Sequence, residues 1–242
     1  MPTTSATFTG GEALVSALLS HGIETIFGLP GVQNDYFYKA VYDAGDRLRV
    51  IHSRHEQGAA YMALGYALAG DRVGVYNVVP GPGFLNTTAA LATAYGCNAK
   101  VLCLTGQIHT DQIGRGYGML HEIPDQMAII RSLTKWAARI VRPQEAPRLL
   151  AMALSEMLSD RPRPVGLEIP LDVLSAKVEM TLPPLPLAVR RPALDLDAVE
   201  RAAQLLGKAK RPLIFVGGGS QDGSEELCAG RPARRGWAHL VD

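Results

Sequence analysis

Apolar runs of strand length alternate with helical patterns along the first 175 residues, and this alternation constrains the fold more than any other feature. A repeating order of strand and helix is typical of a parallel sheet that helices cover on both faces. We therefore predict an α/β fold of this type. The predicted strands lie at about residues 23–31, a run that ends in glycines, at 48–53, 73–79 and 100–106, and in the segment 161–173. The predicted helices lie at 10–21, 34–45 and 144–158 and directly after Glu56 and Thr87.

The first predicted helix has a clear start signal. Thr9 and Glu12 have the spacing of a capping box, in which each side chain binds the other residue's backbone amide. We expect a helix to begin directly after Thr9. The third strand, at 48–53, is short and apolar in its middle, and we expect it to be buried.

A proline-rich segment divides the chain. Residues 180–192 read "MTLPPLPLAVRRP", with neither a helical nor a strand period. Proline fixes φ and lacks an amide donor, so we predict one domain at 1–180, a semi-rigid linker at 181–193 and the start of a second α/β domain at 194–242. Since too few residues follow to complete a second sheet, we expect a truncated chain whose tail is atypical from about Cys228.

Composition narrows the possible partners and compartments. Lys and Arg total 24 against 23 Asp and Glu, which argues against nucleic acid and anionic membrane as partners. The apolar runs are shorter than the roughly 20 residues of a membrane span, and the first residues lack the pattern of a signal peptide. Three cysteines without C-x-x-C spacing suggest neither a disulfide framework nor a zinc site. We expect a cytoplasmic protein.

Two glycine turns and one carboxylate follow predicted strands. "GLPG" at 28–31, "GPG" at 81–83 and Glu56 all lie at carboxyl ends, where a parallel sheet has its ligand crevice. Either turn alone could be an ordinary tight turn, and Glu56 could simply complement a helix dipole. However, small residues dominate the helix after Glu56, so another backbone can approach it closely. We expect a dry, packed carboxyl group there that can share a proton with a ligand nitrogen.

The ordered motifs resemble a known family. "GLPG", "HEQGAAYMALGYA", "GPGFLNT", "LTGQI" and "PVGLEIPLDV" are similar to the N-terminal pyrimidine-binding domain of thiamine-diphosphate-dependent enzymes of the acetolactate synthase and benzoylformate decarboxylase type. The resemblance covers about residues 6–185, and 193–220 look like the start of that family's central domain. Five motifs in order are far more specific than a single glycine pattern.

The resemblance implies roles for particular residues. Glu56 matches the catalytic glutamate that hydrogen-bonds N1′ of the cofactor's aminopyrimidine ring. Pro30 and Gly31 match a loop near the site entrance. Pro82, Gly83 and Asn86 match positions that line the pyrimidine pocket. For His55, we favour a packing role over proton transfer.

One segment departs from the acetolactate synthase pattern. His121 and Glu122 stand where those enzymes carry Phe-Gln. They are either a solvated loop pair or substrate-side residues that select a different substrate or acceptor, so acetolactate synthase activity itself is in doubt. Cleavage or ligation of a carbon-carbon bond in a 2-oxo acid or related carbonyl compound remains the expected chemistry.

The resemblance also implies cofactors and partners. The cofactor is thiamine diphosphate, whose diphosphate and Mg²⁺ are held in this family by a C-terminal Gly-Asp-Gly motif that these 242 residues lack. We therefore expect no metal ligands here, weak cofactor binding and no turnover by this chain alone. The family implies a homodimer or homotetramer, and dependence on FAD stays open.

Three alternatives remain. A nucleotide-binding protein could use Gly217 and Gly219, but Asp222 stands where G-x-G-x-x-G has its last glycine. A metal hydrolase could use His52, His55 and Glu56, although their spacing is not that of the zinc helix motifs. The chain could also be a non-catalytic interaction module.

Overall fold

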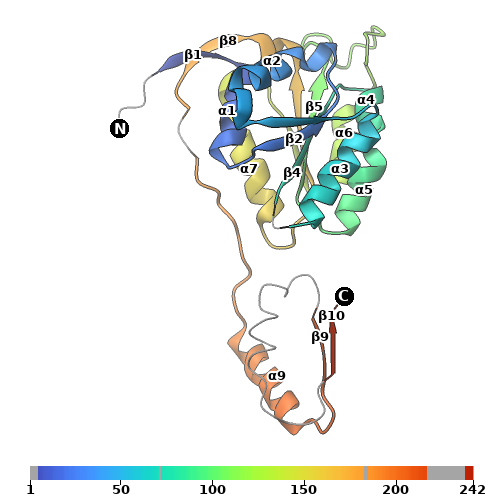
Figure 1. The fold of residues 1–242 in the computed structure, drawn as a ribbon, viewed down its shortest axis with the longest axis vertical. Helices are drawn as coiled ribbons and strands as arrows, with labels where there is room; N and C mark the ends of the chain where they lie inside the picture. Colours follow the sequence, from blue (N-terminus) through green and yellow to red (C-terminus); the bar gives the residue numbers. More distant parts are fainter. Residues whose placement is uncertain (1–4, 71, 183–184, 217–237, 242) are drawn as a thin grey trace. The chain divides into compact units, whose positions relative to one another are not determined.

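The computed structural model describes residues 5–70, 72–182, 185–216 and 238–241 (Figure 1). The chain forms two compact units, Met1–Arg191 and Pro192–Asp242. Cys228 and the glycines at 217–219 lie outside the described residues. None of the described helices is long and apolar enough to cross a membrane.

A parallel six-stranded sheet organises the first unit, which confirms the predicted α/β class. Its strand order is β3-β2-β4-β5-β7-β6, and each neighbouring pair is parallel. The strands are β2 (Thr25–Gly28), β3 (Arg49–His52), β4 (Gly74–Val78), β5 (Val101–Gln107), β6 (Trp136–Arg139) and β7 (Val165–Pro170).

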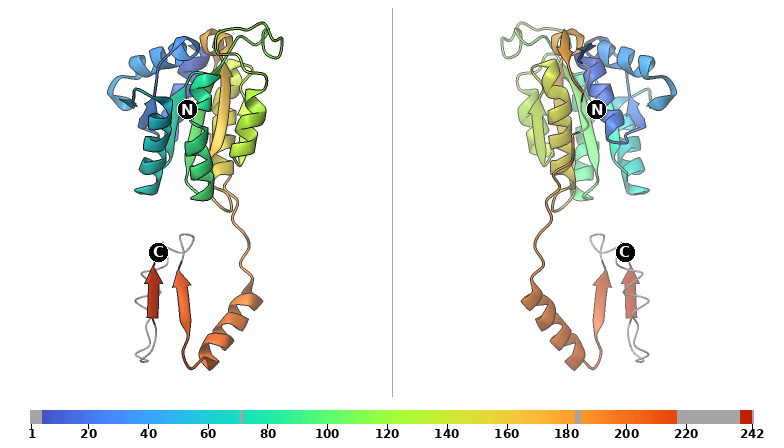
Figure 2. Two further views of the ribbon diagram at one scale, coloured as in Figure 1. Left: turned by 90° about the vertical axis from the view of Figure 1, so that its right-hand side faces the viewer. Right: turned by 90° about the vertical axis from the view of Figure 1, so that its left-hand side faces the viewer.

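Helices cover both faces of this sheet, as Figure 2 shows from two sides. One core cluster contains residues of α1 (Gly10–Ser20), α2 (Asp35–Ala44) and α7 (Ala146–Leu158). A second cluster contains residues of α3 (Glu56–Leu68), α5 (Thr88–Gly96) and α6 (Gln126–Leu133) on the opposite face. The small residues of α3 allow the predicted close approach, because a Cβ added to Gly74 of β4 would lie 2.0 Å from the Ala63 oxygen.

Local signals set the start of α1 as predicted. The Thr9 hydroxyl accepts from the Glu12 amide at 3.1 Å, and the Glu12 carboxylate accepts from the Thr9 amide at 2.7 Å. Both bonds of the capping box are therefore present.

One prediction about the strands needs correction, and the helix predicted after Thr87 is present as α5 (Thr88–Gly96). Among the described strands, β3 lies at the edge of the sheet beside β2, and its first and last residues, Arg49 and His52, are exposed, so it is not a buried strand. The helix predicted after Thr87 is preceded by a separate short helix, α4 (Pro82–Leu85). The chain turns between the two helices, where the Thr87 hydroxyl donates to the Phe84 oxygen at 2.7 Å.

Several short elements were not predicted from the sequence. β1 (Ala6–Thr9) and β8 (Lys177–Met180) form an antiparallel pair that joins the two ends of the first unit. The remaining elements of this unit are α8 (Leu171–Ser175) and the 3₁₀ helices η1 (Val32–Asn34), η2 (Gly45–Arg47) and η3 (Pro143–Glu145).

The segment predicted as a linker is fastened to the first unit up to Arg191. The Ala188 and Arg190 amides donate to the hydroxyls of Ser155 and Ser159 at 3.0 and 2.9 Å. The Arg190 guanidinium also binds both carboxylate oxygens of Glu156, at 2.9 and 2.7 Å. Residues 188–190 therefore follow the surface of α7 instead of extending freely.

Acid should release this segment. The hydrogen bond from Arg190 lowers the pKa of Glu156 below its ordinary value of 4.5. A depressed pKa means that the stabilisation is complete above pH 4.5 and is lost as pH falls through the lower pKa of the folded protein. We expect hydrogen exchange at the Ala188 and Arg190 amides, corrected for intrinsic rates, to speed up below pH 4.5. In Glu156→Gln the fast exchange should already be present at pH 7, and equal protection in both proteins would contradict the assignment.

The second unit is small. It contains α9 (Leu196–Lys208), β9 (Leu213–Val216) and β10 (Ala238–Val241). The Asp195 carboxylate caps α9 by accepting from the Ala198 amide at 2.8 Å. β9 and β10 pair in parallel, so the tail, for which the sequence showed no clear period, includes a strand.

Candidate cofactor site

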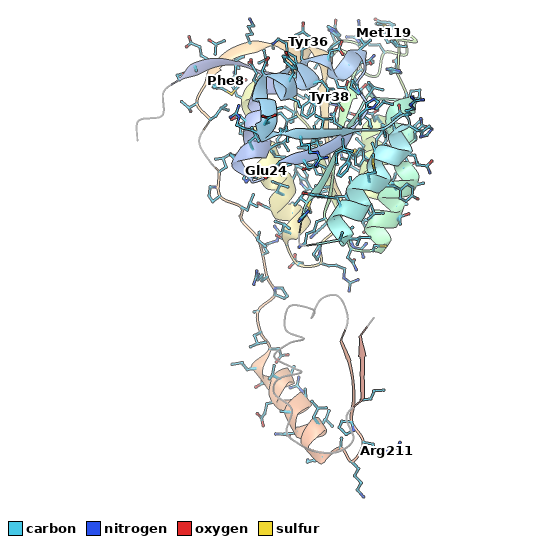
Figure 3. The ribbon with its side chains drawn as sticks, viewed as in Figure 1. Phe8, Glu24, Tyr36, Tyr38, Met119 and Arg211 are labelled. Carbon is cyan, nitrogen blue, oxygen red and sulfur yellow. The ribbon has the colours of Figure 1, made fainter. Side chains whose placement is uncertain are left out.

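The two predicted glycine turns and Glu56 meet at the carboxyl-terminal edge of the sheet. The first turn follows Gly28 at the end of β2, and the second follows Val78 at the end of β4. Glu56 begins α3, four residues after β3 ends at His52. In Figure 3, Met119 and Tyr36 mark this end of the unit.

Val79 brings the two turns together. A Cβ added to Gly31 would lie 2.6 Å from Val79 Cγ1, and one added to Gly83 would lie 2.5 Å from Val79 Cγ2. Both distances are too short for a real side chain, so each turn needs glycine to pack on this valine. The sequence alone could not show that one residue joins them.

Glu56 contacts the second turn directly. Its Oε2 accepts from Asn86 Nδ2 at 2.9 Å, and a Cβ on Gly83 would lie 3.6 Å from its Oε1. Within the part of the chain that the structure describes, Oε1 has no hydrogen bond or ion pair. Glu56 is half-buried, which corrects the expectation of dry, packed surroundings.

The other predicted cofactor-binding residues lie in the same turns. Pro30 and Pro82 are exposed, while Gly83 is buried beneath them in the second turn. Asn86 ends α4 and is exposed except for its bond to Glu56. The structure therefore brings Glu56, Gly83 and Asn86 into contact and places the two prolines at the surface.

Two buried asparagines, which the sequence reasoning missed, support the first turn. Asn34 Oδ1 accepts from the Gly31 amide at 2.7 Å, and its Nδ2 donates to Asn77 Oδ1 at 2.8 Å. Asn77 lies inside β4, whose other residues are mainly apolar. A single polar residue in a buried strand needs a partner, and that signal could have identified it.

His121 is tied to the first turn. Its Nδ1 lies 2.7 Å from Gln33 Oε1, and Gln33 Nε2 donates to the Leu120 oxygen at 3.0 Å. An amide oxygen only accepts, so Nδ1 is the donor in this bond, while Nε2 has no hydrogen bond within the described residues. His121 has φ +68°. His121 is half-buried and hydrogen-bonded to Gln33, so it is not a fully solvated loop residue.

Glu122 has a different role. Its two oxygens accept from the Gly116 amide at 3.0 Å and the Met119 amide at 2.9 Å. Both oxygens are thus engaged by the backbone of the loop that precedes α6. This arrangement favours Glu122 as a support for the loop over direct contact with a substrate.

Replacing Glu122 with alanine should loosen that loop. We expect faster hydrogen exchange at the Gly116 and Met119 amides, because each loses its acceptor. Global stability should fall by only about 1–2 kcal/mol, since both bonds are exposed to water. The measurement is amide exchange by NMR with Glu179→Ala, an exposed glutamate on β8, as control. Unchanged exchange at both amides would contradict the assignment.

His55 does not pack in the core as we favoured. It is exposed, and its Nδ1 accepts from the Gln57 amide at 3.2 Å, so it caps α3. Among the described residues, no group of three or more His, Cys, Asp or Glu could hold a metal ion. The residues of "HSRHE" therefore do not form a metal cluster.

Comparison with known proteins identifies the family. Residues 8–129 match the thiamine pyrophosphate enzyme family, N-terminal TPP binding domain. This chain belongs to that family. The matched segment contains every residue of the site described above, from Pro30 to Glu122.

Curated relatives of this family extend the match beyond the first unit. A probable 2-ketoarginine decarboxylase of Pseudomonas aeruginosa is 38% identical over 226 residues, which cover 92% of this chain and 40% of that protein. A probable acetolactate synthase large subunit of Methanocaldococcus jannaschii is 35% identical over 90% of this chain and 37% of its own length. An acetolactate synthase of Arthrospira platensis is 37% identical over 88% of this chain and 37% of its own. The chain thus spans about two fifths of the length of these relatives.

Proposed function

We propose that this chain supplies the pyrimidine-binding half of a thiamine-diphosphate-dependent site that cleaves or forms a carbon-carbon bond in a 2-oxo acid or related carbonyl compound. The observation that carries the proposal is the hydrogen bond of Glu56 to Asn86, next to Gly83 and inside the matched family segment. The names of the relatives, a 2-ketoarginine decarboxylase and acetolactate synthases, support this class of chemistry.

The residues at this edge fit an aminopyrimidine ring. Asn86 fixes Glu56 Oε2, and Oε1 is left without a partner among the described residues. A carboxyl oxygen in that position can hold or exchange a proton at a ring nitrogen. Gly83 has no side chain on this side, so a flat ring can approach the carboxyl group. When bound, thiamine diphosphate would supply an electron sink for the negative charge that develops on the substrate's carbonyl carbon.

Within the described ranges, no group of three or more His, Cys, Asp or Glu side chains could hold a metal ion. The proposal therefore assigns the diphosphate and its Mg²⁺ to residues other than those described here. Losing these contacts costs about 1.5–3 kcal/mol for each charge-assisted bond. We expect weak cofactor binding and no turnover by the chain alone.

The substrate would meet His121 rather than Glu122. Nε2 of His121 has no hydrogen bond among the described residues, whereas both oxygens of Glu122 accept from loop amides. We propose that His121 contributes to the choice of substrate and that Glu122 holds the loop that carries it.

Assembly into a homodimer or homotetramer is part of the proposal. Apart from Glu56, neither α3 nor α5 contains a charged residue. Tyr61, Leu68 and Tyr95 on these helices are exposed. An uncharged helix pair with exposed aromatic residues is suited to contact another subunit.

Chemical-shift mapping with thiamine tests where the pyrimidine binds. We expect the signals of Gly31, Gly83 and the Asn86 side chain to move on titration of the ¹⁵N-labelled chain. At the same thiamine concentration, Glu56→Ala should make these shifts much smaller. Glu24→Ala is the control, because Glu24 precedes β2 and lies away from Met119 and Tyr36 in Figure 3. Shifts that map to another surface, or that are undiminished in Glu56→Ala, would contradict the proposal.

A further inference from the structure

Close packing and a hydrogen bond at Gly81 fix the position of the second glycine turn. Gly81 has φ +56°, and a Cβ added to it would lie 2.3 Å from the His121 oxygen. Its amide donates to Gln126 Oε1 at 2.7 Å. Gly81 lies two residues before Gly83 and five before Asn86, so its position determines how α4 starts and where Asn86 meets Glu56.

The buried side chain of Gln126 makes three hydrogen bonds. Besides accepting from Gly81, it donates from Nε2 to the Gly106 oxygen at 3.0 Å and to Glu168 Oε2 at 2.8 Å. The orientation of this amide is fixed, because the Gly81 N–H needs an acceptor and the other two partners need a donor. Gln126 thus connects the turn after β4 with the ends of β5 and β7.

Glu168 anchors the glutamine. It lies on β7 and is fully buried. Its Oε2 also accepts from Gln107 Nε2 at 3.1 Å, and its Oε1 forms an ion pair with Arg139 of β6. A buried carboxylate that bonds three side chains is held in one orientation. Its bond to Gln126 Nε2 therefore fixes the orientation of the Gln126 amide as well. Neither residue was singled out from the sequence, although a glutamate within the apolar strand "VGLEIP" is a signal.

We propose that Gln126 and Glu168 are positioning residues for the cofactor site. Through Gly81, they set the position of the Asn86 side chain that orients Glu56. The inference deepens the proposed function and rests on it for the identity of the ligand. The hydrogen-bonded path runs from Glu168 through Gln126 to Gly81, and the covalent chain continues it to Asn86.

Gln126→Met tests this inference. Methionine has a similar length but can neither accept from Gly81 nor donate to Glu168. In the free ¹⁵N-labelled protein, the side-chain NH₂ signals of Asn86 should move toward their positions in Glu56→Ala, in which the Asn86 bond is absent. Thiamine binding should weaken by roughly fivefold, as expected for the loss of one hydrogen bond.

Thr134→Val is the matched control. Thr134 is buried and bonds the Ile130 oxygen at 2.8 Å at the other end of α6. This variant should lower the melting temperature while leaving the Asn86 signals unchanged. Unchanged Asn86 signals in a folded Gln126→Met protein would overturn the inference.

A second variant tests the same inference if the first one does not fold. Should Gln126→Met fail to fold, Glu168→Gln replaces it and should displace the same Asn86 signals; unchanged signals there would overturn the inference as well. Since these signals are measured without ligand, a failure of thiamine to bind would count against the proposed function and not against the positioning role.

Discussion

Replacing Gly81 with alanine should lower the free energy of unfolding by about 3 kcal/mol. The positive φ of Gly81 costs an L-residue about 1–2 kcal/mol. The new Cβ would also lie 2.3 Å from the His121 oxygen, and relieving such a clash costs roughly another 1–3 kcal/mol. Chemical denaturation of the isolated chain measures the change. Because the turn carries Gly83 and Asn86, thiamine binding should be lost as well.

Gly65→Ala is the matched control for this prediction. Gly65 lies in α3 with nothing within 4 Å of an added Cβ. Alanine in a helix is more stable than glycine by roughly 0.5–1 kcal/mol, so this variant should gain stability. Equal effects of the two substitutions would contradict the geometry assigned to Gly81.

Removing the Glu56 carboxylate should weaken thiamine binding by about 10- to 100-fold. A hydrogen bond to a charged group contributes about 1.5–3 kcal/mol, and Glu56→Ala loses it completely. Asn86 also loses its acceptor, but it is exposed and can bond water instead. Global stability should therefore change little. NMR titration of the variant measures the affinity.

Gln57→Ala controls for the helix start. Gln57 is the exposed neighbour of Glu56 in the first turn of α3. Its replacement should leave thiamine affinity within a factor of two or so, since surface substitutions have small effects. A similar loss of affinity in both variants would show that the helix, and not the carboxylate, matters for binding.

Local patterns predicted the main elements of the fold. Thr9 and Glu12 signalled the start of α1, and the alternation of strands and helices indicated the parallel sheet. Short elements escaped because their stability depends on distant partners. β6, for example, has only four residues and extends a sheet next to β7. The antiparallel pair of β1 and β8 joins segments that are about 170 residues apart.

Turn chemistry and the family resemblance predicted that the two glycine turns and Glu56 lie together, but not the contacts that hold them there. Glycine at positions 31, 81 and 83 marked the two turns, but their contact through Val79 arises only in the folded chain. The same is true of Gln126, which contacts residues 81, 106 and 168. Small residues in α3 correctly indicated close packing of that helix. They did not predict how much of the Glu56 side chain would be buried.

The most direct test compares thiamine with thiamine diphosphate, each with and without Mg²⁺, by titration of this chain and of Glu56→Ala. If the chain supplies only the pyrimidine half, both ligands should bind weakly and with similar affinity, Mg²⁺ should change little, and Glu56→Ala should weaken the binding at least about tenfold. Tight, Mg²⁺-dependent binding of thiamine diphosphate, or binding that does not depend on Glu56, would contradict the account.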